Sequence, residues 1–251
     1  ACEQPNPHNF AQEEIASWEE QAERVTIIRD QFGIPHVYGQ SDADAVFGML
    51  YAQAEDDFPR VERNYYWAVG RMAEVQGEEA LYSDLRARMY MTLDEAKELY
   101  ETAPKWLKEL CQAYADGLNY FLYTHPEVEP ETITRFEPWF PLFFFEGSIG
   151  GDIERVRTSR IKAFYGDGEE VAMSEYASPD EIAVLDEPRG SNGIAISGDL
   201  TQSGNAMLLI NPHTSFYFRG ESQVVSEEGL NAYRATTWGQ FFIYQGFNEH
   251  T

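Results

Sequence analysis

Apolar and β-branched residues in the first forty positions gather in two short stretches. Val25–Asp30 is the first, and Val37-Tyr38 resumes the extended pattern after Gly33 and Pro35. Two extended stretches separated by a glycine and a proline are typical of strands joined by a tight turn. The polar, proline-bearing residues 1–14 that precede them predict a loose leader.

Apolar residues then recur at helical spacing from residue 43 to about residue 124. Ser41 with Asp44 three positions later is a helix-capping pattern, and Pro59 predicts a break or a new start within the first helix. Leu93 and Ala103-Pro104 mark further helix starts. One apolar stripe comprises Leu107, Leu110, Cys111, Tyr114, Leu118 and Phe121. We therefore expect a helix-rich middle third, with Cys111 as a buried thiol.

Strand-like stretches return only after an acidic segment with glycines and prolines, which predicts an exposed connector. They are Ile194–Ile196, Ala206–Ile210 and Gln223–Val225. Helices followed by strands predict an α+β fold. The strand run is unfinished at Thr251, so we expect it to continue in a longer chain.

The pattern divides the chain into three regions. Residues 1–165 are mostly helical, residues 166–190 form the acidic connector, and residues 191–251 carry the strands that begin a sheet.

Composition narrows the class of protein. The 251 residues are 43% hydrophobic and 14% aromatic, which is enough for a packed core. With 18 basic and 43 acidic residues, the formal charge of −25 repels phosphate backbones and argues against nucleic acid as a partner. An acidic surface of this kind is typical of a solvated face, and cation binding is the less favoured interpretation.

The N-terminus is the one part of the sequence that suggests attachment to a membrane. The most apolar stretch, Phe136–Phe145, is too short to cross a bilayer and contains Pro138 and Pro141, so we expect it to form core or, less favoured, a pocket wall. Cys2 after the small Ala1 resembles the mature terminus of a bacterial lipoprotein. A cloning remnant followed by an ordinary thiol is an equally open interpretation.

Three segments contain candidate chemistry: Arg189–Gly193, Asn211–His213 and Ile28–Tyr38. Taken singly, each has a plain structural interpretation. Gly190-Ser191-Asn192 is a turn, His213 is a hydrogen-bonded structural histidine, and Arg29-Asp30 is an ion pair at a strand end. Their order along the chain is the informative feature.

That order resembles the penicillin acylase family of N-terminal-nucleophile hydrolases. Arg29 through Tyr38 is similar to the family's R-D-x-x-G-x-P-H-x-Y opening, and Phe47 through Asp56 to its F-G-x-x-Y-A-x-A-x-D pattern. Gly190-Ser191-Asn192 resembles the processing site, and Gly204 through His213 the strand that follows it. His213 stands where the penicillin G branch usually has glutamine, so the resemblance is greatest to the cephalosporin and acyl-homoserine-lactone acylases.

The resemblance implies an αββα sandwich, incomplete in this chain, with a helix-rich α-chain region. It implies self-cleavage between Gly190 and Ser191, an α and β chain heterodimer, and Ser191 as the N-terminal nucleophile whose own α-amine is the base. His213 would orient that amine and hydroxyl, and Asn192 would anchor the new terminus. The family's main oxyanion-hole donors belong beyond Thr251.

The implied substrate is a small N-acyl compound: a β-lactam, an acyl-homoserine lactone or a related amide. No cofactor is required. A calcium ion is known in parts of the family, and the resemblance assigns it no ligands here. The expected location is the periplasm, with membrane contact only through a lipid on Cys2. The alternative is a non-catalytic acidic periplasmic lipoprotein that keeps the fold for binding; the Gly190-Ser191 pair argues against it.

Overall fold

The computed structural model describes residues 8–143, 156–165, 191–213 and 219–250. The chain divides into two compact units, and each is described by itself. The first comprises Ala1–Val171 and Arg219–Thr251, and the second is Ala172–Phe218. Cys2, Gly190, Phe144-Phe145 and the predicted connector of residues 166–190 lie outside the described residues.

Helices and strands are mixed in the first unit, which confirms the predicted α+β class. The helices are α1 (Gln12–Ala22), α2 (Asp42–Ala68), α3 (Met72–Gln76), η1 (Gly77–Ala80), α4 (Leu81–Arg88), α5 (Leu93–Thr102), α6 (Lys105–Thr124), η2 (Phe140–Phe143) and α7 (Thr158–Tyr165). The strands are β1 (Val25–Arg29), β2 (Pro35–Gly39), β5 (Arg219–Ser226), β6 (Asn231–Thr237) and β7 (Gln245–Phe247).

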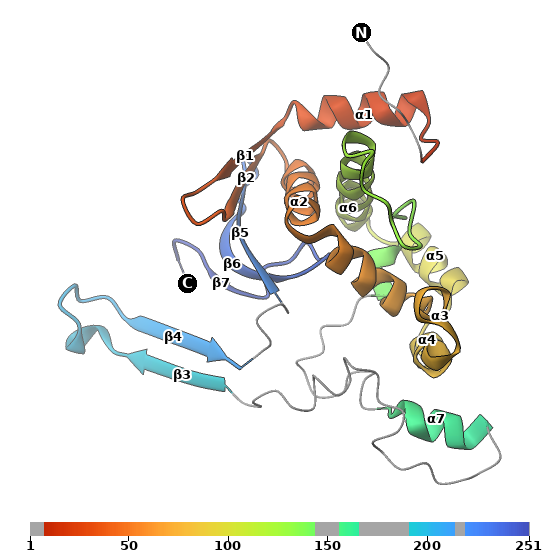
Figure 1. Cartoon of the computed structure of the whole chain (residues 1–251). Coiled ribbons are helices and arrows are strands. Elements are labelled where there is room, and N and C mark those ends of the chain that lie inside the picture. Colours follow the sequence, from red (N-terminus) through yellow and green to blue (C-terminus); the bar gives the residue numbers. More distant parts are fainter. Residues whose placement is uncertain (1–7, 144–155, 166–190, 214–218, 251) are drawn as a thin grey trace. The chain divides into compact units, whose positions relative to one another are not determined.

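The five strands form one sheet in the order β1-β2-β5-β6-β7. β1 and β2 are the predicted antiparallel pair, and β2 runs parallel to β5, so strands from the two ends of the sequence meet in the middle of the sheet. α2 covers one face and α6 packs behind α2 (Figure 1). The two helices approach so closely at Gly117 that a Cβ there would lie 2.4 Å from the Phe47 carbonyl oxygen.

α2 begins and bends where its sequence predicts. The Ser41 side chain accepts a hydrogen bond from the Asp44 backbone N–H, and Asp44 completes the capping box. The helix is kinked at Asp57, whose φ of −158° and ψ of 69° are not helical, two residues before Pro59. The Asp57 carboxylate accepts from the Arg60 backbone N–H at 3.1 Å and so caps the second half of the helix.

The prediction of a loose leader is wrong for residues 10–14. α1 begins at Gln12, and Phe10 is buried against Trp18, with ring centroids 5.0 Å apart. The Trp18 indole N–H donates to Asp116 of α6 at 2.8 Å. Asp116 lies 98 residues from Trp18, so the local sequence carries no sign of this contact.

α2 also holds the C-terminal part of the chain in place. The Gln53 side-chain amide donates to the Gln240 carbonyl and accepts from the Gly239 backbone N–H, at 2.9 and 2.8 Å. The Tyr65 hydroxyl donates to the Gly239 carbonyl. The buried Gln53 amide thus satisfies backbone groups of the loop after β6 and fixes that loop to the helix.

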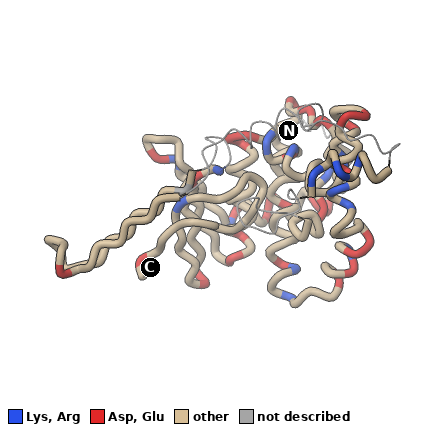
Figure 2. The backbone as a smooth tube through the Cα atoms, turned by 90° about the horizontal axis from the view of Figure 1, so that it is seen from below, with Lys and Arg blue, Asp and Glu red and all other residues tan. Residues whose placement is uncertain are grey.

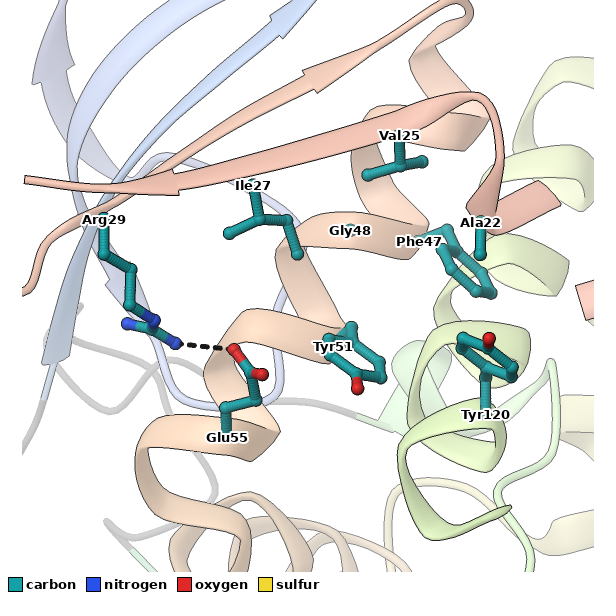
Figure 3. A pocket seen from close by; sticks show the side chains of 9 residues that line it. All are labelled: Ala22, Val25, Ile27, Arg29, Phe47, Gly48, Tyr51, Glu55 and Tyr120. Carbon is teal, nitrogen blue, oxygen red and sulfur yellow. Dashed lines mark hydrogen bonds and ion pairs between the residues drawn. The ribbon is translucent and has the colours of Figure 1, made fainter. Parts of the chain in front are cut away.

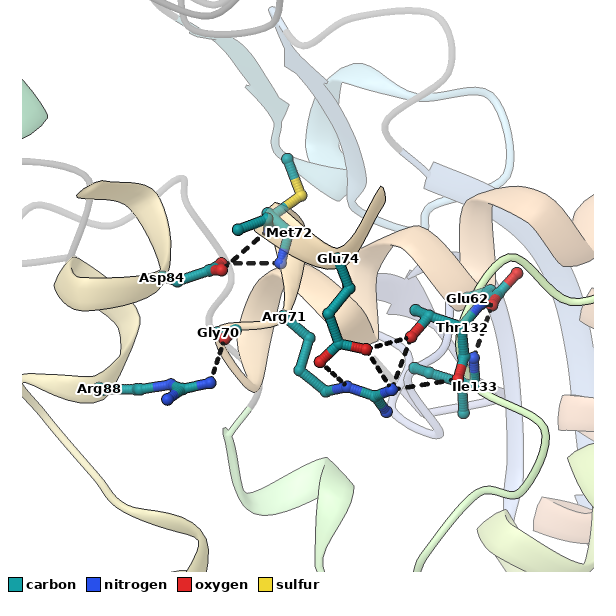
Figure 4. Close-up of polar contacts among 10 residues, drawn as sticks. Glu62, Gly70, Arg71, Met72, Glu74, Asp84, Arg88, Thr132 and Ile133 are labelled. Atoms are coloured by element: carbon teal, nitrogen blue, oxygen red, sulfur yellow. Dashed lines mark hydrogen bonds and ion pairs between the residues drawn. The ribbon is translucent and has the colours of Figure 1, made fainter. Parts of the chain in front are cut away.

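A polar network closes the first unit at the far end of α2 (Figure 4). The buried Glu62 carboxylate accepts hydrogen bonds from the backbone N–H groups of Glu131, Thr132 and Ile133, at 3.0, 2.7 and 2.8 Å. Nearby, Arg71 pairs with Glu74 at 2.6 Å. The loop that leads into the aromatic segment is therefore held by a charged helix side chain.

The aromatic segment itself is core, as favoured, in its described part. Phe136, Phe140 and Phe143 are buried, and Phe136 lies edge-on to Tyr65 and Tyr114. The α6 stripe packs into the same core, with Cys111 buried as predicted; burial raises the pKa of its thiol to about 11. Across the described ranges, no helix combines the length and apolarity needed to cross a membrane.

Candidate active site

The described part of the second unit is a single antiparallel hairpin. β3 (Ser191–Ile196) pairs with β4 (Met207–Pro212), and η4 (Gly198–Leu200) lies in the connection. The register places Ser191 opposite Pro212 and Ile196 opposite Met207. Both strands overlap the predicted strand-like stretches. β3 begins three residues earlier than predicted, so the candidate nucleophile Ser191 is the first residue of a strand and not part of a turn.

The hairpin brings together three of the residues assigned by the resemblance. Ser191 begins β3 at the end of the hairpin where β4 finishes, and His213 follows β4 directly. The Asn192 side-chain nitrogen lies 3.1 Å from His213 Nε2. Twenty-one residues of sequence separate these two side chains, so the strand register alone juxtaposes them. Gly190, the predicted processing partner, lies outside the described residues.

The two faces of the hairpin separate these residues. Directly opposed residues of an antiparallel pair share a face, so Ser191 shares its face with Gly193 and Ala195, while Asn192 shares the other face with Asn211. His213 contacts the Asn192 side. Among the described residues no hydrogen bond joins His213 to Ser191, so the predicted orientation of the Ser191 amine by His213 stays a prediction.

Few charges lie near the candidate nucleophile within the described hairpin. Asp199 is the one Asp, Glu, Lys or Arg side chain of residues 191–213. Ser191, Asn192 and His213 are all exposed. A freed Ser191 α-amine in such a setting starts from an ordinary pKa of about 7.7–8.0, which suits a base at neutral pH.

The early Arg29-Asp30 pair is structural, and its members bind different partners. Arg29 forms ion pairs with Glu55 at 2.9 Å and Asp56 at 2.7 Å on α2. Asp30 accepts from two backbone N–H groups of the following turn and lies 3.6 Å from His36 Nε2. The prediction that Arg29 and Asp30 pair with each other is wrong, because Arg29 takes its partners from α2, where the F-G-x-x-Y-A-x-A-x-D segment lies.

No group of His, Cys, Asp and Glu side chains in the described ranges is arranged to hold a metal ion. The structure also contains features that the sequence patterns did not single out. These are the buried Glu62 and a pocket lined by Tyr51, Glu55 and Tyr120.

Known proteins similar to this chain include bacterial acylases. Acyl-homoserine lactone acylase QuiP of Pseudomonas fluorescens is 27% identical over 198 residues, which is 74% of this chain and 24% of QuiP. Acyl-homoserine lactone acylase PvdQ of Pseudomonas syringae pv. tomato is 25% identical, over 94% of this chain and 34% of PvdQ. The chain thus spans about a quarter to a third of the length of these relatives.

Among solved structures, a thermostable penicillin G acylase from Alcaligenes faecalis matches with a TM-score of 0.45 and 21% identity, over 64% of this chain and 89% of that chain. The family profile described as penicillin amidase matches residues 24–251. That range contains both early motifs, the Ser191 hairpin and every strand of the five-stranded sheet. The chain belongs to the penicillin amidase family.

Proposed function

We propose that the complete protein is an amide hydrolase that removes the acyl group of a small N-acyl substrate with Ser191 as its N-terminal nucleophile. One observation carries the proposal. In a chain of the penicillin amidase family, a hairpin begins at Ser191 and sets Asn192 and His213 together at that same end. No observation favours the non-catalytic alternative.

Maturation begins with the Ser191 hydroxyl, whose oxygen attacks the Gly190 carbonyl carbon. The Gly190–Ser191 C–N bond breaks, the nitrogen takes a proton and becomes the α-amine, and an ester joins Gly190 to the serine oxygen. Water then hydrolyses this ester and leaves a Gly190 carboxylate, a free hydroxyl and a free amine. Glycine suits this step because it has no side chain to obstruct the carbonyl.

In turnover, Ser191 supplies both the base and the nucleophile. The Ser191 amine accepts the hydroxyl proton, the oxygen attacks the substrate carbonyl, and the substrate amine leaves with the proton. Water hydrolyses the acyl-serine ester in the second half. His213 acts here as a positioning residue: its hydrogen bond fixes the Asn192 amide next to the new terminus. The α and β chains of one precursor form the active heterodimer, and the β chain supplies the oxyanion-hole donors beyond Thr251.

Acyl-homoserine lactones are the first substrates to test, because QuiP and PvdQ are named for that activity. Penicillins and cephalosporins are the second group. The proposed location is the periplasm, with a lipid anchor on Cys2. Cys2→Ser should then move the native protein from the membrane fraction to the soluble fraction, and an unmodified N-terminal mass of native material would contradict the anchor. A single acyl chain holds only weakly, so multiple acylation is part of this proposal.

Processing is the direct test of the nucleophile. Denaturing mass analysis of the complete protein should give two pieces, the second beginning at Ser191. Ser191→Ala should give one uncut chain, with acylase activity reduced by more than about 1,000-fold. Ser197→Ala, at the serine that directly follows β3, is the matched control and should be processed normally. A second piece that starts at another residue would reject the assignment.

A further inference from the structure

A pocket of about 340 Å³ opens in the first unit beside β1 (Figure 3). One wall is the helix-facing side of β1, and the floor and opposite wall come from α2 and α6. Its lining comprises Ala22, Val25, Ile27, Arg29, Phe47, Gly48, Tyr51, Glu55 and Tyr120. This volume lies in the range of small-molecule sites. None of the residues assigned to amide hydrolysis lines it.

One end of the pocket is aromatic. The Tyr120 ring lies 5.6 Å from that of Phe47 and 5.8 Å from that of Tyr51, centroid to centroid, in tilted arrangements. Both tyrosines are half-buried, and the aliphatic Val25 and Ile27 lie opposite them on β1 (Figure 3). Rings grouped in this way attract a cation through their faces as well as an apolar chain.

At the other end of the pocket, the polar atom still open to a ligand is a carboxylate oxygen of Glu55. The Arg29 guanidinium already donates to the carbonyl oxygens of Gly33 and Ala52 and pairs with Glu55 and Asp56. Its terminal nitrogens are therefore committed, and two carboxylates face one cation. Only Oε2 of Glu55 takes part in its ion pair; Oε1 accepts no hydrogen bond from the described residues.

Negative charge reaches the aromatic end as well. Burial is the largest cause that raises the pKa of the Tyr51 hydroxyl, and the carboxylate of Glu55 raises it further. At Tyr120 burial again comes first, and the carboxylate of Glu19 adds to it. Both phenols stay neutral at physiological pH, in a field that favours a positive ligand.

We propose that this pocket binds a hydrophobic organic ammonium ion, a primary amine that carries a short apolar chain. The ammonium donates to Oε1 of Glu55, and the chain lies between Ile27 on β1 and the rings of Tyr51 and Tyr120. An anion of the same shape meets the Glu55 carboxylate and a committed guanidinium, and is excluded. The proposal does not depend on the proposed amide hydrolysis, because none of the residues assigned to that reaction lines the pocket.

The test titrates the complete protein with n-hexylammonium, n-hexanol and n-hexanoate while the isoleucine methyl resonances are followed by NMR. The Ile27 methyl should move with n-hexylammonium. The Ile28 methyl, on the opposite face of the same strand, is the internal control and should stay in place. Binding of n-hexylammonium should exceed that of n-hexanol by about tenfold, as expected for one charge-assisted hydrogen bond, and n-hexanoate should bind most weakly.

Two variants locate the contacts. Glu55→Gln should remove the preference for n-hexylammonium over n-hexanol, whereas Glu109→Gln, which removes an exposed ion pair with Lys105 on α6, should keep it. Tyr120→Leu should weaken both ligands.

The titrations of the unaltered protein with the three ligands test the proposal even if a variant fails to fold. Equal binding of n-hexanol or n-hexanoate, an unmoved Ile27 methyl, or a preference that survives in folded Glu55→Gln would each overturn the proposal.

Discussion

The two units use the same apolar residue types with opposite results. In the first unit Leu50, Tyr114 and Leu118 are fully buried, at 0% exposed, because α2, α6 and the sheet enclose them. In the hairpin Met207, Leu208 and Leu209 are 58%, 68% and 54% exposed. Within the described part of the second unit, the two strands have no third strand or helix to cover either face. Hydrophobic sequence therefore produces a core only where enough elements meet.

Charge separates the units in the same way. The first unit contains buried charged residues, among them Glu62 and Arg86. The Glu62 carboxylate accepts from the Ile133 backbone N–H, and the Arg86 guanidinium donates to the Val156 carbonyl. Asp199 is the one charged residue of the described hairpin, residues 191–213, and most of the tube in Figure 2 that belongs to this hairpin is tan. Within the hairpin, the titratable groups near Ser191 are thus its own amine, once freed, and the His213 imidazole. The buried core that stabilises the described fold therefore lies in the first unit, and the candidate nucleophile lies in the second.

The sharpest test of this contrast compares two leucines. In the 251-residue chain, Leu118→Ala removes buried methyl groups and leaves a cavity, and should lower the free energy of unfolding by about 2–5 kcal/mol. Leu208→Ala, at an exposed hairpin position, should lower it by less than about 0.5 kcal/mol. Urea unfolding followed by circular dichroism measures both. Equal losses would mean that the hairpin shares the core of the first unit.

Glu62→Gln tests whether a charged side chain holds the loop of residues 131–133. The amide offers one acceptor oxygen in place of two and turns an N–H group toward backbone donors. The substitution should therefore lower the free energy of unfolding by about 2–4 kcal/mol. Glu127→Gln, at an exposed site, is the matched control. An unaffected Glu62→Gln protein would show that the loop is held by its aromatic residues alone.

His213→Gln separates positioning from stability. Because His213 is exposed, the melting temperature should change little, with a stability loss below about 0.5 kcal/mol. If His213 tunes the Ser191 amine, the acidic limb of the pH–rate profile should shift by about one pH unit in the processed enzyme. A stability loss of about 1–3 kcal/mol with an unmoved profile would make His213 a structural residue instead.

The smallest effect concerns Glu74. Its hydrogen bonds with Arg71, then with Thr132, lower its pKa from the ordinary 4.5 to about 2. A depressed carboxylate pKa stabilises the fold fully above the ordinary value, and this stabilisation is lost as the pH falls from about 4.5 toward 2.

The Glu74 side chain is 49% exposed, so solvent screening keeps the contribution below about 1 kcal/mol. Urea midpoints should show Glu74→Gln less stable than the unaltered protein at pH 7, by a smaller margin at pH 3, and nearly equal to it at pH 2. The exposed Glu79→Gln should show a smaller difference at pH 7. A Glu74→Gln deficit that is as large at pH 2 as at pH 7 would assign the effect to packing.

Local patterns predicted much of this fold. The S-x-x-D cap at Ser41, the break before Pro59, the helix starts at Leu93 and after Pro104, and both hairpin strands all lie where sequence places them. Capping, proline geometry and side-chain periodicity act within a few residues, so a short window contains their whole cause. The helix at the N-terminus was missed because Trp18 and Phe10 take their partners from α6 and beyond.

By itself, the sequence determined the class of elements, the family and the identity of the candidate nucleophile, because local periodicity and motif order carry that information. Only the tertiary structure decided that β2 pairs in parallel with β5, 187 residues away, and that Glu62 and Glu55 take the partners they have. The same holds for the contact between Asn192 and His213. Such contacts depend on strand register and on the packing of distant segments, which no local window contains.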